Sequence, residues 1–321
     1  MFFSSRRATI ALAAAGLASI ATAASAQMEI KLMAPAAPGG GWDATARSMQ
    51  QAMVAAGAAK SVQVTNVAGA GGMVGLAQFV NAAKGDGSQL MVNGFVMVGA
   101  IILNKSPVTL DMVTPIARLT AEAEVIVVPA NSPIKDAKDL AAAVKADPAK
   151  VTWAGGSAGG VDHIMAALFA GAVGADASKI NYVPFSGGGE ALAALLGGRV
   201  TAGLSGWSEF EGQIKAGKLR AIAVSSGNRL ADNPTPTLKE QGINLEVINW
   251  RSVVAAPGIS ADQKKALADA IDKMVKSPAW AEVLKQRGWD DAYLSGPAFD
   301  AFLKSEMTRV ADVMKAVGLV K

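Results

Sequence analysis

The amino-acid sequence predicts an α/β protein of two lobes, on three observations. Short apolar runs alternate with longer stretches of helical periodicity, which is typical of βαβ units and largely parallel sheets. The 321-residue chain keeps about 295 residues after a leader segment, near the size at which one hydrophobic core divides into two. Glycine clusters stand where predicted strands meet predicted helices.

The first 26 residues are predicted to be a signal peptide. Arg6 and Arg7 precede an apolar, alanine-rich run over 8–24, and Ala24-Ser25-Ala26 has the small-x-small pattern that a signal peptidase reads. The run is shorter than the about 20 apolar residues of a transmembrane anchor. We therefore expect cleavage near Gln27 and a periplasmic protein, with the general and twin-arginine export routes both open.

Composition excludes several classes of site. The chain has no cysteine, which excludes disulfides, thiolate metal sites and a lipid anchor. With one histidine and no run of acidic residues resembling a calcium loop, we expect neither metal nor cofactor. The formal charge of +4 includes the two leader arginines, and no Lys/Arg-rich run occurs, so nucleic acid is not an expected partner.

The elements of the first unit follow from periodicity. Apolar residues at helical spacing, among them Trp42, Ala46 and Met49, predict a helix over 42–56. The other predicted elements are strands over 29–33, 62–67 and 89–93, a helix over 74–83 and a crossing strand over 125–129.

The same alternation repeats in a second unit before the chain returns to the first. The second unit has predicted helices over 135–146, 161–173, 190–196 and 208–216 and strands over 151–154, 180–184, 200–204 and 219–225. A strand over 246–256 leads back, and helices over 261–276 and 297–317 complete the chain. We therefore predict that residues 27–124 and 248–321 form one lobe and that residues 125–247 form an inserted second lobe.

Five predicted junctions are rich in glycine: 38–43, 69–72, 155–160, 186–190 and 205–209. Glycine lets backbone N–H groups point inward, and a helix N-terminus adds a positive partial charge, so such junctions bind anions without charged side chains. One such loop is explained by a tight turn alone. Several at the same end of the strands favour a shared ligand crevice.

Two of these loops formally match enzyme motifs. Gly39-x-Gly41-x-x-Ala44 fits a dinucleotide fingerprint, but the acidic residue expected about 20 residues later is missing. Gly155-x-Ser157-x-Gly159 fits a nucleophile elbow, but the only histidine, His163, lies on the helix that follows Ser157 instead of on a late loop.

Charged side chains near the loops have structural explanations. Carboxylates in the first turns of the predicted helices, Asp43, Asp162, Glu190 and Glu209, are either acid–base groups or caps of the helix dipole. Arg47 follows Asp43 by four residues, a spacing that favours a surface ion pair over a ligand contact. We expect His163 to be solvated or to support the ligand shell.

The loops also carry a family resemblance, because an ordered series of motifs spans essentially the whole mature chain. These are Pro38-Gly39-Gly40-Gly41-Trp42-Asp43, Asn66-Val67-Ala68-Gly69-Ala70-Gly71-Gly72, Tyr182-Val183-Pro184-Phe185-Ser186-Gly187-Gly188-Gly189-Glu190, Ala216-Gly217-Lys218-Leu219-Arg220 and Pro236-Thr237-Leu238-Lys239-Glu240-Gln241-Gly242. In order and spacing they resemble the receptors of tripartite tricarboxylate transporters, the TctC or Bug-type solute-binding family.

The resemblance implies a type II periplasmic-binding-protein fold, the Venus flytrap, with a ligand cleft between the lobes. It also implies that backbone N–H groups and ordered water hold the ligand carboxylate. The ligand-binding residues expected from it are Pro38, Gly39, Gly40, Gly41, Trp42, Asp43, Gly69, Ala70, Gly71, Gly72, Asn93, Gly94, Phe95, Gly156, Ser157, Ala158, Gly159, Asp162, Phe185, Ser186, Gly187, Gly188, Gly206, Trp207 and Ser208.

The resemblance further implies a monomeric receptor, with no catalytic role, that delivers a small carboxylate to the large and small membrane subunits of a transporter. The loop motifs look closest to the tricarboxylate branch, which favours a ligand such as citrate. Dicarboxylates, aromatic acids and amino acids are the alternatives within the family. A secreted serine esterase using Ser157 and His163 is the alternative outside it.

Overall fold

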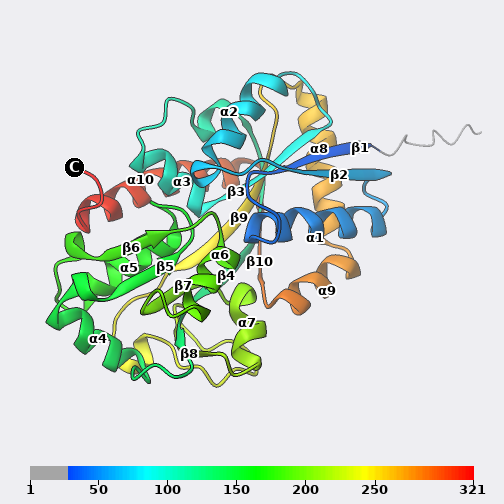
Figure 1. Ribbon diagram of the computed structural model, residues 1–321. Coiled ribbons are helices and arrows are strands. Elements are labelled where there is room, and N and C mark those ends of the chain that lie inside the picture. Colours follow the sequence, from blue (N-terminus) through cyan, green and yellow to red (C-terminus); the bar gives the residue numbers. More distant parts are fainter. Residues whose placement is uncertain (1–27) are drawn as a thin grey trace, which may run out of the picture.

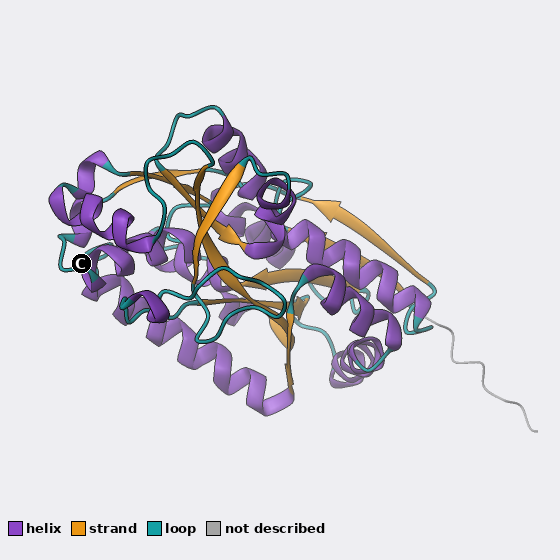
Figure 2. Ribbon diagram, turned by 90° about the horizontal axis from the view of Figure 1, so that it is seen from below, coloured by secondary structure: helices purple, strands orange, loops and turns teal. Residues whose placement is uncertain are grey.

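The computed structural model describes residues 28–321, so the predicted signal peptide lies outside the described residues. Figure 1 shows one lobe across the top and right of the view, built from the first and last parts of the chain, and a second at the lower left, built from the middle part. Helices lie on both faces of the strands, as the second view makes clear (Figure 2).

The first lobe is organised on a mixed sheet. Its strands are β1 (Glu29–Ala34), β2 (Ser61–Asn66), β3 (Gln89–Gly94), β9 (Ile248–Ala255), β10 (Asp290–Ser295) and the first part of β4 (Thr114–Pro129). β1 pairs in parallel with β2 and β3, whereas β9 runs antiparallel to β3 and β4. The helices are α1 (Gly41–Ala55), α2 (Met73–Ala82), α3 (Phe95–Leu103), α8 (Ala261–Val275), α9 (Pro278–Arg287) and α10 (Gly296–Ala316).

The second lobe uses the remainder of β4. Residues 124–129 of that strand pair antiparallel with β7 (Ala202–Gly206) and β8 (Leu219–Val224). β7 pairs in parallel with β5 (Thr152–Gly155), which in turn pairs in parallel with β6 (Asn181–Pro184). The helices are α4 (Ala137–Ala146), α5 (Val161–Ala172), α6 (Gly188–Leu196) and α7 (Trp207–Lys215). Short 3-10 turns occur at Ala70–Gly72, Leu110–Met112, Pro148–Lys150, Ala177–Lys179 and Lys239–Gln241.

Several elements differ from the sequence predictions. The expected largely parallel arrangement holds for β1–β3 and β5–β7, but the strands that join the lobes are antiparallel. β4 begins at Thr114, well before the crossing predicted over 125–129. α3, α9 and β10 were not predicted. α3 gave no amphipathic signal because its sequence, FVMVGAIIL, is apolar throughout and most of its residues are buried.

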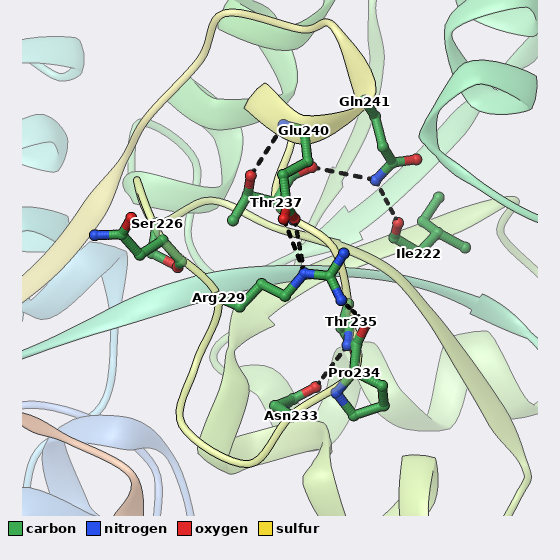
Figure 3. A network of polar contacts seen from close by, with 10 residues as sticks. Ile222, Ser226, Arg229, Asn233, Pro234, Thr235, Thr237, Glu240 and Gln241 are labelled. Carbon is green, nitrogen blue, oxygen red and sulfur yellow. Dashed lines mark hydrogen bonds and ion pairs between the residues drawn. The ribbon is translucent and has the colours of Figure 1, made fainter.

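The irregular segment after β8 is fixed to the second lobe by a polar network (Figure 3). Arg229 Nε donates to both carboxylate oxygens of Glu240, at 2.9 and 3.0 Å, and Glu240 also accepts from the Thr237 amide at 2.8 Å. Gln241 Nε2 donates to the Ile222 carbonyl at 2.9 Å. The Pro236–Gly242 motif therefore has a role in the fold, and none of its residues lines the cleft described below.

Candidate functional site

A cavity of about 90 Å³ lies where the glycine-rich junctions of the two lobes converge. Loops of opposite lobes approach closely there: a Cβ built on Gly187 would lie 3.8 Å from the Gly40 Cα, and one built on Gly71 would lie 3.6 Å from the Ser157 Cβ. Such short separations show that the cleft is closed.

Helix N-termini open onto this cavity without side-chain caps. The N-cap residues of α1, α2, α5, α6 and α7 are all glycines, and none of them makes a side-chain capping bond. Away from the cleft, α4, α8 and α9 are capped by Asp136, Ser260 and Ser277, whereas α3 and α10 also begin without a side-chain cap. Because uncapped helix N-termini present unsatisfied N–H groups and a positive partial charge, their convergence makes the cavity electrostatically suited to an anion.

First-turn carboxylates fix the shape of the loops. The amides of Gly39, Gly156 and Ser186 donate to the carboxylates of Asp43 (2.9 Å), Asp162 (2.5 Å) and Glu190 (2.9 Å), which explains these acidic residues without catalysis. Burial acts to raise the pKa of Asp43, but hydrogen bonds from Arg47, Gly39 and Asn66 outweigh it and hold this pKa below its usual value.

Arg47 forms the expected ion pair with Asp43, at 3.0 Å, and does not line the cavity. Its side chain is half exposed.

His163 supports the loop that precedes α5. Its Nδ1 accepts from the Gly159 amide at 3.1 Å, and its ring stacks on Tyr182 at 4.4 Å between centroids. Burial lowers the pKa of His163 to about 4, so the ring is neutral, and of the two expectations for His163 the structure favours the supporting role over a solvated ring. With Nδ1 occupied, the proton of the neutral ring is on Nε2, and the ring offers no free basic nitrogen to Ser157.

A cluster of buried charges lies at the cleft floor. Arg251, on β9, forms an ion pair with Glu122, on β4, and the two side chains are 3% and 0% exposed. Glu124 lies two residues along the same strand, where burial and the neighbouring Asp162 raise its pKa well above the usual value. Burial raises the pKa of Glu209 to about 7, opposed by a hydrogen bond from Ser205 and by the charge of Arg251.

Many of the residues expected to bind ligand do line the cavity: Gly40, Gly41, Trp42, Gly69, Ala70, Gly71, Gly72, Gly156, Ser157, Asp162, Ser186, Gly187, Gly188 and Gly206. Others do not: Pro38, Gly39, Asp43, Asn93, Gly94, Phe95, Ala158, Gly159, Phe185, Trp207 and Ser208. Among the latter, Asn93 Oδ1 accepts from the Ser252 hydroxyl at 2.7 Å, and Phe95 lines a separate cavity together with Arg118 and Trp250.

Sequence reasoning missed Asn249 and Arg251 as lining residues and Glu122 and Glu124 as their neighbours on the cleft floor. A signal for them was present. In both β4 and β9, these polar residues alternate with apolar or small ones, which places them on one face of a buried strand. A charged stripe inside an otherwise apolar strand is typical of a site because burial of a lone charge is costly.

The fold and this cleft define a two-lobed periplasmic binding protein. The structure of the periplasmic binding protein BugD superposes with a TM-score of 0.80 at 25% sequence identity, covering 91% of this chain and 98% of that one. None of the helices described between residues 28 and 321 combines the length and apolarity needed to cross a membrane.

More narrowly, the chain belongs to the tripartite tricarboxylate transporter family receptors, whose family model matches residues 45–319. It is 28% identical to BugT of Bordetella pertussis over 295 residues, covering 90% of this chain and 89% of the relative. It is 30% identical to a protein encoded in the tcbD–tcbE intergenic region of a Pseudomonas strain, covering 87% and 83%. Proteins of this family are solute-binding receptors and not enzymes.

Proposed function

We propose that this protein captures a small carboxylate anion in the cleft and delivers it to a tripartite tricarboxylate transporter. The observation that carries the proposal is the convergence of five helix N-termini, each preceded by a glycine N-cap, on one cavity. The glycine loops of the two lobes form opposite walls, so that a bound carboxylate connects them and stabilises closure.

Within this class, the loop motifs favour a tricarboxylate such as citrate. The charges of the cleft floor limit how many carboxylates it can take. Glu122 is paired with Arg251, but the carboxyl groups of Asp162 and Glu209 also line the cavity, and each of them repels a ligand carboxylate when it is ionised. Each ligand carboxylate must therefore lie against a helix N-terminus or against Arg251 to avoid repulsion. Dicarboxylates and amino acids, which carry less negative charge than citrate, are the direct competitors.

The partners in this proposal are the large and small membrane subunits of the transporter, which receive ligand from a monomeric receptor in the periplasm. The leader with its Ala24-Ser25-Ala26 site supports that location, because a receptor must cross the inner membrane to meet extracytoplasmic solute.

A thermal-shift screen with small-angle scattering tests the proposal. Citrate, cis-aconitate, tricarballylate, succinate, glutamate, nicotinate and terephthalate are added in turn. At a ligand concentration of about 100 times Kd, a specific ligand stabilises the folded state by about 2.7 kcal/mol. Each ligand that stabilises should also reduce the radius of gyration, because it closes the lobes.

The two measurements fail in different ways. A dicarboxylate or aromatic acid as the best ligand overturns the choice of citrate alone. Stabilisation without compaction contradicts the closing mechanism, and no response to any carboxylate contradicts the receptor function.

A further inference from the structure

The cleft floor holds buried polar atoms for which the chain supplies no partner. Arg251 forms its ion pair with Glu122 through Nη2, but its Nη1 has no hydrogen-bond partner among residues 28–321. Glu209 accepts the Ser205 hydroxyl hydrogen through Oε2, while its Oε1 has no partner in the same part of the chain. Unpaired buried polar atoms are costly, so such atoms beside a ligand cavity indicate groups that the ligand satisfies.

Both side chains line the same cavity of about 90 Å³, so one small molecule in that cavity lies beside both of them. They lie close enough for the charge of each to act on the pKa of the other. One is a donor only and the other, when ionised, an acceptor only, so together they present complementary hydrogen-bonding groups to a ligand.

The glycine loops leave room for this pair. A Cβ on Gly41, the first residue of α1, would lie 2.5 Å from Arg251 Nη2, and one on Gly188, the first residue of α6, would lie 2.7 Å from Glu209 Oε2. Glycine at these two positions therefore lets the helix N-termini, which attract a carboxylate, approach the charged side chains directly.

We propose that Arg251 and Glu209 recognise a second polar group on the ligand, Arg251 donating to a ligand oxygen and Glu209 accepting from a ligand hydroxyl or ammonium. This inference rests on the proposed function, because it assumes that the glycine walls hold a carboxylate of the same molecule. The simplest acids with this combination are 2-hydroxy and 2-amino carboxylates. An acid with only methylene groups between its carboxylates leaves Glu209 Oε1 unpaired.

Matched ligands test the pairing on the wild-type protein. Malate, aspartate and succinate share a four-carbon dicarboxylate skeleton and differ at C2 by a hydroxyl, an ammonium and a hydrogen; citrate and tricarballylate form a second pair that differs by one hydroxyl. Calorimetry at pH 8 keeps Glu209 largely ionised, because its pKa is about 7. We expect succinate to bind about ten- to a hundredfold more weakly than the better of malate and aspartate, and tricarballylate similarly more weakly than citrate.

Variants assign the effect to Glu209. Glu209→Gln should reduce the preference for the donor-bearing acid to about threefold or less. Glu211→Gln, on the same helix and paired with Lys215 outside the cavity, is the matched control and should keep the wild-type preference.

Three outcomes overturn the pairing while the receptor function stands. These are equal binding of succinate and both of its substituted analogues, preferred binding of a carboxylate that has no donor group, and an unchanged preference in Glu209→Gln. Failure of every carboxylate to bind overturns the receptor function itself.

Discussion

Closure of the cleft can be tested at the contact between Gly99, on α3 of the first lobe, and Gly159, in the loop before α5 of the second. A Cβ on Gly99 would lie 1.9 Å from the Gly159 carbonyl oxygen, so the two backbones would have to separate by about 1.5 Å to reach ordinary contact. Crowding of this kind typically costs about 1–3 kcal/mol. If opening releases the contact, Gly99→Ala should weaken ligand binding about 5- to 150-fold.

The same substitution should not harm the open, ligand-free protein. Gly99 lies inside a helix, where alanine is preferred to glycine by about 0.5–1 kcal/mol, so the melting temperature without ligand should stay constant or rise. Gly171→Ala is the control, since Gly171 also lies in a helix and its added Cβ would meet no atom within 4 Å apart from its chain neighbours and the backbone of its own helix. Calorimetry and thermal melts of both variants decide the matter. Wild-type affinity in Gly99→Ala, or an equal loss in the control, refutes the reasoning.

Further predictions concern the loops, the cleft floor and the leader. Arg47→Ala should change ligand Kd by less than about fivefold, because Arg47 pairs with Asp43 outside the cavity. Gly156→Val should weaken binding at least about tenfold, because its side chain would crowd Asp162. If calorimetry gives the reverse order, the proposed binding of the carboxylate by backbone N–H groups is contradicted. Glu209 has its pKa raised from 4.5 to about 7, so its contribution to stability is present below pH 4.5 and lost as pH rises through 7. Chemical denaturation should therefore find Glu209→Gln more stable than wild type at pH 8, by up to about 3 kcal/mol, and no more stable at pH 4; equal stability at both pH values contradicts this. Protein recovered from the periplasm should have the intact mass of a chain that begins near Gln27, and a full-length chain in the inner membrane contradicts the predicted signal peptide.

Sequence patterns predicted the parts of the fold in which local periodicity and burial agree. α1 has a clear apolar face, and its predicted and observed extents nearly coincide. α3 has no polar face, and β10 pairs only with the distant β4, so neither carries a strong local signal.

The candidate site was predictable to the same degree. The glycine junctions reveal the walls because a helix start after a strand is encoded locally. The pairing of Glu122 with Arg251 joins residues far apart in the sequence, and only the antiparallel register of β4 and β9 brings them together. The helix that carries His163 was predicted, but the partial burial of its ring was not, because Tyr182, which stacks on it, comes from the separate strand β6.

The shared strand β4 has a consequence for folding cooperativity. Its residues up to Ala123 pair with β9, and those from Glu124 onward pair with β7 and β8, so the second sheet takes a central strand from a segment that begins in the first. If either sheet unfolds, the half of β4 that paired with it loses the hydrogen-bond partners of its backbone. We therefore expect the two lobes to unfold as a single unit, so that a heating curve shows one transition where the shape of the molecule suggests two.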